Sequence, residues 1–186
     1  MTISLSNLDS DLKFRDPFVT QDGSQRAHVS MKNLATLWFN TGTLCNLACK
    51  NCYIESTPRN DRLSYLKLDE VEPYLEEIVR EGHQTDEIGL TGGEPFMNPD
   101  ILEIIRSVLK RGFSTLVLTN GMRPMMRPAI RSGLLKLNTE FSDKLTVRVS
   151  VDHFDRVIHE KERGLGSWVP MVEGLRWLSA NNFQIA

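Results

Sequence analysis

The sequence predicts an α/β fold built on parallel strands, and two observations support this class. Short apolar runs alternate along the chain with longer segments whose apolar residues recur at helical spacing. Three of the apolar runs end at Thr91, Asn120 and Asp152, which are 29 and 32 residues apart. This is the length of one strand–helix–strand step, so it favours parallel strands joined by right-handed crossovers.

Four apolar runs have the length and composition of strands. The clearest is the last, in which valines at alternate positions, beginning with Val147, face away from Arg148, Ser150 and Asp152. The predicted strands are residues 34–39, 88–91, 115–119 and 146–152, and residues 183–185 begin a fifth.

The segments between these strands carry helix signals. Asp69 and Glu72 match a capping box at the start of one helix, and Pro99 suits the first helical position of the next. Glycines follow the last apolar positions of both segments, as is common at helix ends. The predicted helices lie within residues 69–82, 98–112, 124–137 and 171–178.

The chain is expected to have two regions. Residues 1–33 form an N-terminal extension, in which Asp22-Gly23 favours the tight turn of a possible hairpin. Residues 34–186 form the core domain, whose rhythm places the end of a fifth strand just beyond Ala186. A strand without its covering helix would leave an apolar face exposed, so we expect this core to be truncated after about four strand–helix units.

Composition and charge are those of an ordinary globular domain. The chain is 40% hydrophobic and 25% charged, and its 22 basic and 24 acidic residues give a formal charge of −2. This balance provides no positive field for a nucleic acid. The first residues lack the basic and apolar pattern of a secretory signal, and no apolar run approaches the ~18 residues of a membrane span. We therefore expect a cytoplasmic protein with no nucleic-acid or membrane partner.

All three cysteines of the chain fall in one short stretch, at Cys45, Cys49 and Cys52. In a reducing compartment, such a group indicates metal or redox chemistry more than a disulfide. Three thiolates make a soft anionic site that suits an iron–sulfur cluster or zinc. A 4Fe–4S cluster held by three cysteines keeps one iron open for another ligand.

Other chemically informative residues follow the predicted strands, at the carboxyl ends where ligands collect in parallel α/β folds. Gly92 and Gly93 would let the backbone approach a ligand closely. Ser150 and Asp152 are two positions apart on one strand, so they would face the same cavity.

Two further residues have both a structural and a functional interpretation. Glu94 either caps the following helix or contacts a ligand, and its backbone is the stronger candidate for that contact. Asn120, at a strand end, either forms a turn or contacts a ligand.

The cysteines match the pattern C-x3-C-x2-C on the loop after the first strand, which resembles the signature of the radical S-adenosylmethionine (radical SAM) enzymes. The segment Thr91–Pro95 is similar to the GGEP segment of that family, which meets the methionine amino group of SAM. Asn51 departs from the family pattern, because an aromatic residue is common immediately before the last cysteine.

The resemblance implies a partial (β/α) TIM-like barrel of parallel strands and a SAM site beside the cluster. Tyr53 looks like the aromatic residue that often follows the last cysteine, and Arg163 is similar to an arginine that holds the SAM carboxylate in some members. Ser150 and Asp152 match the fourth-strand positions that reach the carboxylate or ribose. The expected cofactor-binding residues are Tyr53, Gly92, Gly93, Glu94, Asn120, Ser150, Asp152 and Arg163, and the expected cluster ligands are Cys45, Cys49 and Cys52.

The implied activity is reductive cleavage of SAM. The 4Fe–4S cluster passes one electron to the sulfonium, and the resulting 5′-deoxyadenosyl radical abstracts a hydrogen from a substrate, a small molecule or a peptide. The implied partners are SAM and a reductant such as flavodoxin or ferredoxin. The motifs assign no catalytic side chain.

Two other interpretations of the cysteines stay open at this point. One is a structural zinc site completed by His28, His83 or His153, and the other is a redox pair of Cys49 and Cys52. With a purely structural metal, zinc or iron–sulfur, the protein would be a non-catalytic binding module.

Overall fold

The computed structural model describes residues 16–186 of the chain, which divides into two compact units, Met1–Lys32 and Asn33–Ala186. In the first unit, Gly23 adopts a positive φ of 84° and closes a turn. A single antiparallel bridge joins Val19 to Gln25. The predicted hairpin is therefore a turn with one bridge, without two regular strands.

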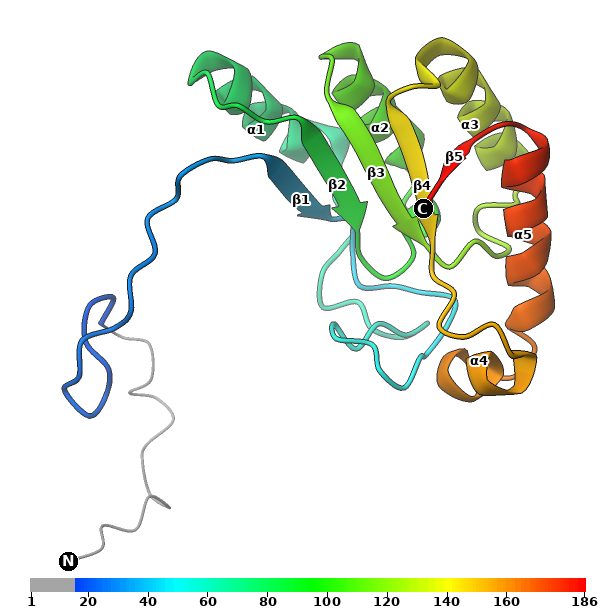
Figure 1. Cartoon of the computed structure of the whole chain (residues 1–186), viewed down its shortest axis with the longest axis horizontal. Coiled ribbons are helices and arrows are strands. Elements are labelled where there is room, and N and C mark those ends of the chain that lie inside the picture. Colours follow the sequence, from blue (N-terminus) through cyan, green and yellow to red (C-terminus); the bar gives the residue numbers. More distant parts are fainter. Residues whose placement is uncertain (1–15) are drawn as a thin grey trace, which may run out of the picture. The chain divides into compact units, whose positions relative to one another are not determined.

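The second unit is built on one sheet of five parallel strands in the order β1-β2-β3-β4-β5 (Figure 1). The strands are β1 (Thr36–Asn40), β2 (Glu87–Thr91), β3 (Ser114–Thr119), β4 (Leu145–Val149) and β5 (Gln184–Ile185). Every neighbouring pair is parallel, and spatial order follows chain order without reversal. β1 and β5 do not pair with each other, so the sheet is open. This is the arrangement of a partial (β/α) barrel, as predicted.

Five α-helices and one short 3-10 helix connect or follow the strands. They are α1 (Leu68–Arg80), η3 (Pro95–Met97), α2 (Ile101–Lys110), α3 (Pro128–Phe141), α4 (Arg156–Arg163) and α5 (Trp168–Ala180). Figure 1 shows α1, α2 and α3 side by side along one face of the sheet. Within residues 16–186, no helix combines the length and the apolar character needed to cross a bilayer.

The main core lies between this sheet face and the helices. Its fully buried members include Leu75 of α1, Ile104 and Ile105 of α2, Leu134 of α3, and Val117 and Val147 of the sheet. The predicted apolar helix faces are thus the ones that pack on the strands.

Two predicted helix starts are wrong. The predicted cap of α1, Asp69 with Glu72, is displaced, because the helix begins at Leu68 and the Glu70 carboxylate accepts from the backbone N–H of Lys67 (2.8 Å). Glu72 instead pairs with an arginine at the end of α2. The prediction that Pro99 occupies the first position of the next helix is also wrong, because α2 begins at Ile101, after a turn.

Asn98 explains that later start. Its side-chain amide donates to the carbonyl oxygens of Thr41 (3.0 Å) and Leu66 (2.7 Å), and its side-chain oxygen accepts from Asp100 N–H (2.8 Å). Because Asn98 is fully buried in these contacts, the chain turns there and becomes helical only afterwards.

The end of β4 and the helix after it also differ from the prediction. β4 ends at Val149, so Ser150 and Asp152 lie on the loop that follows it. That loop enters α4, which the sequence analysis did not predict. Asp155 caps α4 by accepting from the backbone N–H groups of Val157 (2.9 Å) and Ile158 (3.1 Å). Figure 1 places α4 at the end of the sheet to which the strands point.

Candidate functional site

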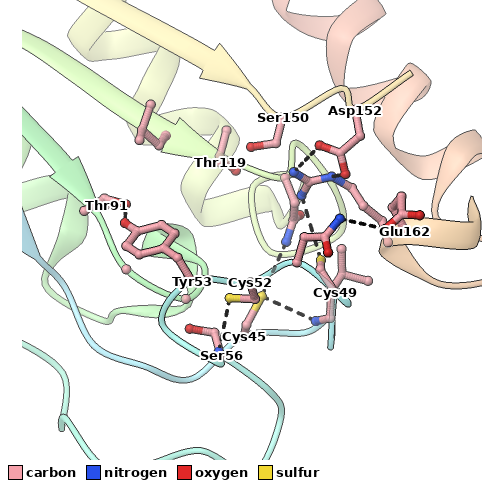
Figure 2. Close-up of a pocket in the computed structure, with 17 residues that line it drawn as sticks. Cys45, Cys49, Cys52, Tyr53, Ser56, Thr91, Thr119, Ser150, Asp152 and Glu162 are labelled. Atoms are coloured by element: carbon pink, nitrogen blue, oxygen red, sulfur yellow. Dashed lines mark hydrogen bonds and ion pairs between the residues drawn. The ribbon is translucent and has the colours of Figure 1, made fainter. Parts of the chain in front are cut away.

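A cavity of about 400 Å³ opens at the carboxyl ends of the strands (Figure 2). The cysteine loop after β1, the segment after β2, the end of β3, the loop after β4 and the last turn of α4 all contribute to its wall. The predicted site residues that line it are Cys45, Cys49, Cys52, Tyr53, Gly92, Gly93, Asn120, Ser150, Asp152 and Arg163. Leu47, Asn51, Ser56, Thr91, Leu118, Thr119 and Glu162 complete the lining. Of the predicted site residues, only Glu94 lies outside the wall.

The cysteine loop directs backbone N–H groups at its sulfurs. Cys45 is buried, with 7% of its surface exposed, and its Sγ accepts from Leu47 N–H (3.4 Å). The Sγ of Cys52 accepts from Ser56 N–H (3.2 Å). The backbone N–H of Cys45 donates to the Thr57 carbonyl oxygen (3.1 Å), which fixes the start of the loop. Such donors stabilise sulfur that carries negative charge.

Cys45 and Cys49 resist ionisation when no metal is bound to them. The pKa of Cys45 is raised to about 11, mainly by burial; the N–H of Leu47 lowers it, and negative charge on Glu94, Cys49 or Cys52 contributes to the rise. Burial also raises the pKa of Cys49, although the guanidinium of Arg163 opposes this. A partly buried group of mutually repelling thiolates needs a cationic centre among them, so these residues fit an iron–sulfur cluster.

This pKa predicts how Cys45 responds to an alkylating reagent in the metal-free chain. With a pKa of about 11, only about one thiol in a thousand is ionised at pH 8. The alkylation rate of Cys45, measured by mass spectrometry with iodoacetamide, is expected to rise about tenfold per pH unit between pH 8 and pH 10. A rate that levels off near the ordinary thiol value of 9.0 would contradict the assignment.

The diglycine segment after β2 packs backbone to backbone against the cysteine loop. Gly92 has a φ of 147°, and a Cβ there would lie 2.7 Å from the Gly42 carbonyl oxygen. A Cβ on Gly93 would lie only 2.1 Å from the Leu44 carbonyl oxygen. The N–H of Gly93 donates to Gly42 (2.7 Å) and that of Glu94 donates to Leu44 (3.1 Å). Both glycines are therefore required for this contact.

Glu94 turns its carboxylate into the protein, not into the cavity. The side chain is 2% exposed and accepts from Phe96 N–H (3.2 Å), Thr119 Oγ1 (2.7 Å) and Asn120 N–H (2.8 Å). Burial raises the pKa of Glu94, although these three donors lower it. The side-chain oxygens cap η3 and tie the segment after β2 to the end of β3, which agrees with the structural interpretation of Glu94, and the expected ligand contact through its backbone stays a prediction.

Asn120 both forms a turn and contacts the cysteine loop. Its side-chain oxygen accepts from Met122 N–H (3.1 Å), which closes the turn after β3. Its amide donates to the side chain of Asn46 (2.8 Å) and lies 3.8 Å from the Sγ of Cys45. Asn120 therefore braces the cysteine loop from the sheet side.

An ion pair closes one side of the cavity. Nε of Arg163 lies 2.8 Å from Oδ2 of Asp152, and Nη2 donates to Oδ1 (2.9 Å). The third nitrogen, Nη1, is 4.0 Å from the Sγ of Cys49. Paired cation and carboxylate offer separate contacts for a ligand that carries both a carboxylate and hydroxyl groups.

Tyr53 forms the outer edge of the cavity. It is 80% exposed, and its hydroxyl lies 3.5 Å from Oγ1 of Thr91 at the end of β2. From the sequence, Thr91 was predicted as a strand end and as the first residue of the GGEP-like segment, and its contact with Tyr53 was not predicted.

A contact between the cysteine loop and α4 was not predictable from the motifs. The side-chain amide of Asn51 donates to the carboxylate of Glu162 (2.9 Å). The available signal was Asp155, a residue type that favours helix N-termini, but the eight-residue helix after it is too polar to show an apolar stripe.

The donor sets differ for zinc and for a cluster. In residues 16–186, no three or more His, Cys, Asp or Glu side chains are grouped so that they could hold a metal ion. His83 and His153 do not line the cavity, so the zinc alternative has no assembled ligand set in this part of the chain. Each thiolate of a 4Fe–4S cluster binds a different iron, so the sulfurs surround the cluster without converging on one point.

Comparisons with known proteins find a family, similar sequences and similar folds. The family model described as the Radical SAM superfamily matches residues 39–185. The "Antilisterial bacteriocin subtilosin biosynthesis protein AlbA" of Bacillus subtilis is 32% identical over 136 residues, 73% of this chain and 28% of AlbA. The "GTP 3',8-cyclase" of Marinobacter nauticus is 36% identical over 97 residues, 50% of this chain and 29% of the cyclase.

Solved structures share the fold. Streptococcus suis SuiB bound to precursor peptide SuiA has a TM-score of 0.66 and 18% identity, over 81% of this chain and 31% of SuiB. The chain thus spans about a third of the length of these proteins.

Proposed function

The chain belongs to the radical SAM superfamily, whose enzymes use a 4Fe–4S cluster and SAM, and we propose that residues 34–186 form a core domain that holds both in the cavity. When bound, the cluster supplies the electron that cleaves SAM to a 5′-deoxyadenosyl radical, which takes a hydrogen from the substrate. The observation that carries the proposal is the meeting of the C-x3-C-x2-C loop with the diglycine segment on one wall.

The residues of the chain have distinct parts in this proposal. Cys45, Cys49 and Cys52 hold three irons and leave the fourth open to the amine and carboxylate of SAM. The backbone at Gly92 and Gly93, which both line the cavity, meets the methionine amine.

The remaining contacts orient the nucleoside. We assign the SAM carboxylate to Arg163, which must then share or release Asp152. Ser150 and Asp152 are assigned to the ribose hydroxyls, and Tyr53 is assigned to the outer edge of the nucleoside. Asn120 is assigned a cofactor contact from the cavity wall beside the cysteine loop. With SAM bound in the pocket, these contacts also keep water and competing hydrogen donors away from the radical.

The substrate is proposed to be a small molecule or a peptide. AlbA is named for the biosynthesis of a bacteriocin, and SuiB was solved with a precursor peptide, whereas the cyclase is named for GTP. The electron is assigned to a reductant such as flavodoxin or ferredoxin. Because the three thiols must stay reduced, a cytoplasmic location is part of the proposal.

Anaerobic reconstitution with iron and sulfide tests the proposal. The product is expected to be brown, with about four irons per chain. Adding SAM is expected to change the electron paramagnetic resonance spectrum of the reduced cluster, because SAM binds the open iron. A colourless protein that retains zinc, or a spectrum that never responds to SAM, would favour the binding module instead.

A further inference from the structure

The last turn of α4 contacts the part of the cysteine loop that carries two of the three thiols (Figure 2). The backbone N–H of Lys50 donates to the Glu162 carbonyl oxygen (3.0 Å). The side-chain amide of Asn51 donates to the Glu162 carboxylate (2.9 Å). Lys50 and Asn51 are the two residues between Cys49 and Cys52, so one glutamate holds this segment through its backbone and its side chain.

Glu162 is not explained by the needs of its own helix. It lies in the last turn of α4 between Lys161 and Arg163, just before Gly164 ends the helix. The C-terminal end of a helix carries partial negative charge, which favours the two basic neighbours and disfavours a carboxylate. The hydrogen bond from Asn51 offsets this local cost.

The pair depends on the side-chain amide of Asn51, because a carboxylate accepts hydrogen bonds and needs a donor at this position. We propose that Glu162, through Asn51, is a positioning residue that keeps Cys49 and Cys52 in place for the cluster. This inference rests on the proposed function of the same site.

The contact also connects two walls of the cavity. Arg163, the next residue along α4, reaches both Asp152 and the Sγ of Cys49. The turn that anchors the loop through Glu162 therefore also carries the cation assigned to SAM, so a displaced loop would change both.

The test uses the metal-free full chain and the alkylation rate of each cysteine, measured with iodoacetamide and mass spectrometry. Glu162→Ala is expected to accelerate alkylation of Cys49 and Cys52 about fivefold, the size expected from losing one exposed hydrogen bond to a charged group. Cys45 is the internal reference, because its own contacts, to Leu47, Thr57 and Asn120, do not involve α4. Glu162→Gln keeps an acceptor for Asn51, so its rates should stay within about twofold of the wild-type rates.

A paired substitution tests the hydrogen bond itself. Asn51→Asp sets two carboxylates against each other and should release the loop. Adding Glu162→Gln supplies an amide that donates to the new carboxylate, so the double variant should again protect Cys49 and Cys52. The double variant carries the same net charge at this pair as the wild type, so the comparison of these two isolates the contact.

Lys161→Ala is the matched control, because Lys161 is an exposed neighbour on α4 whose side chain makes no hydrogen bond or ion pair in residues 16–186. Its alkylation rates should equal those of the wild type. The proposal is overturned if Glu162→Ala leaves Cys49 and Cys52 unchanged, if all three cysteines accelerate equally, or if the double variant fails to restore protection. These rates need neither iron nor SAM, so they are independent of the iron content and spectral response that test the function.

Discussion

Replacing Cys49 with alanine is expected to leave the reconstituted protein with less than half of its iron and without detectable 5′-deoxyadenosine formation. The two remaining thiolates would leave a second iron of the cluster without a protein ligand, and a cluster held at two points is readily lost. Iron per chain and the yield of 5′-deoxyadenosine in the presence of a strong reductant are the measurements.

His83→Ala is the control for this variant. His83 was a candidate ligand in the zinc interpretation, but it does not line the cavity. Its replacement should leave the iron content near four per chain, as expected for a cysteine-held cluster. Full iron retention in the Cys49 variant, or loss of metal in the His83 variant, would show that the ligand set is wrong.

Glu94→Ala is expected to lower the free energy of unfolding by about 3 kcal/mol or more, because it removes a fully buried acceptor from three donors. The donors left without a partner are Phe96 N–H, Thr119 Oγ1 and Asn120 N–H. Urea unfolding followed by circular dichroism measures the change. Glu76→Gln, an exposed glutamate of α1, is the control and should shift stability by less than about 0.5 kcal/mol.

The same residue predicts a dependence of stability on pH. Burial raises the pKa of Glu94 above its ordinary value of 4.5 in the folded chain, so the folded state binds this proton more tightly than the unfolded state. The stability that this tighter proton binding contributes is therefore fully present below pH 4.5, and it is lost as the pH rises through the raised pKa of Glu94. The free energy of unfolding of the wild type minus that of Glu94→Gln should decline above pH 4.5. A difference that grows with pH would contradict the direction of the pKa shift.

Much of the fold could be predicted because its signals are local. Apolar runs and helical spacing mark β2, β3, β4 and the faces of α1, α2 and α5, since burial on one face imposes a period on the sequence. α4 was not predicted, because its eight residues are mostly polar and show no apolar stripe at helical spacing. The helix starts at Leu68 and Ile101 were misplaced because contacts from distant residues, above all those of Asn98, decide where the chain becomes helical.

The candidate site, too, has a part that could be predicted from the sequence and a part that could not. The cysteines and Gly92-Gly93 could be found from short motifs, and the parallel strands predicted that they would meet at one edge. The inward turn of the Glu94 carboxylate and the hold of Glu162 on the cysteine loop could not be found, because both depend on partners from other segments that only the folded chain brings close.

The contact of Gly93 with Leu44 bears on how this site can diverge during evolution. The surfaces that meet there are carbonyl oxygens and amide hydrogens, so the side chain of Leu44 contributes nothing to their fit. Mutations at such positions can accumulate without moving the sulfurs, provided that positions 92 and 93 acquire no side chain. Distant homologues can thus keep one chemistry while sharing few residues around it.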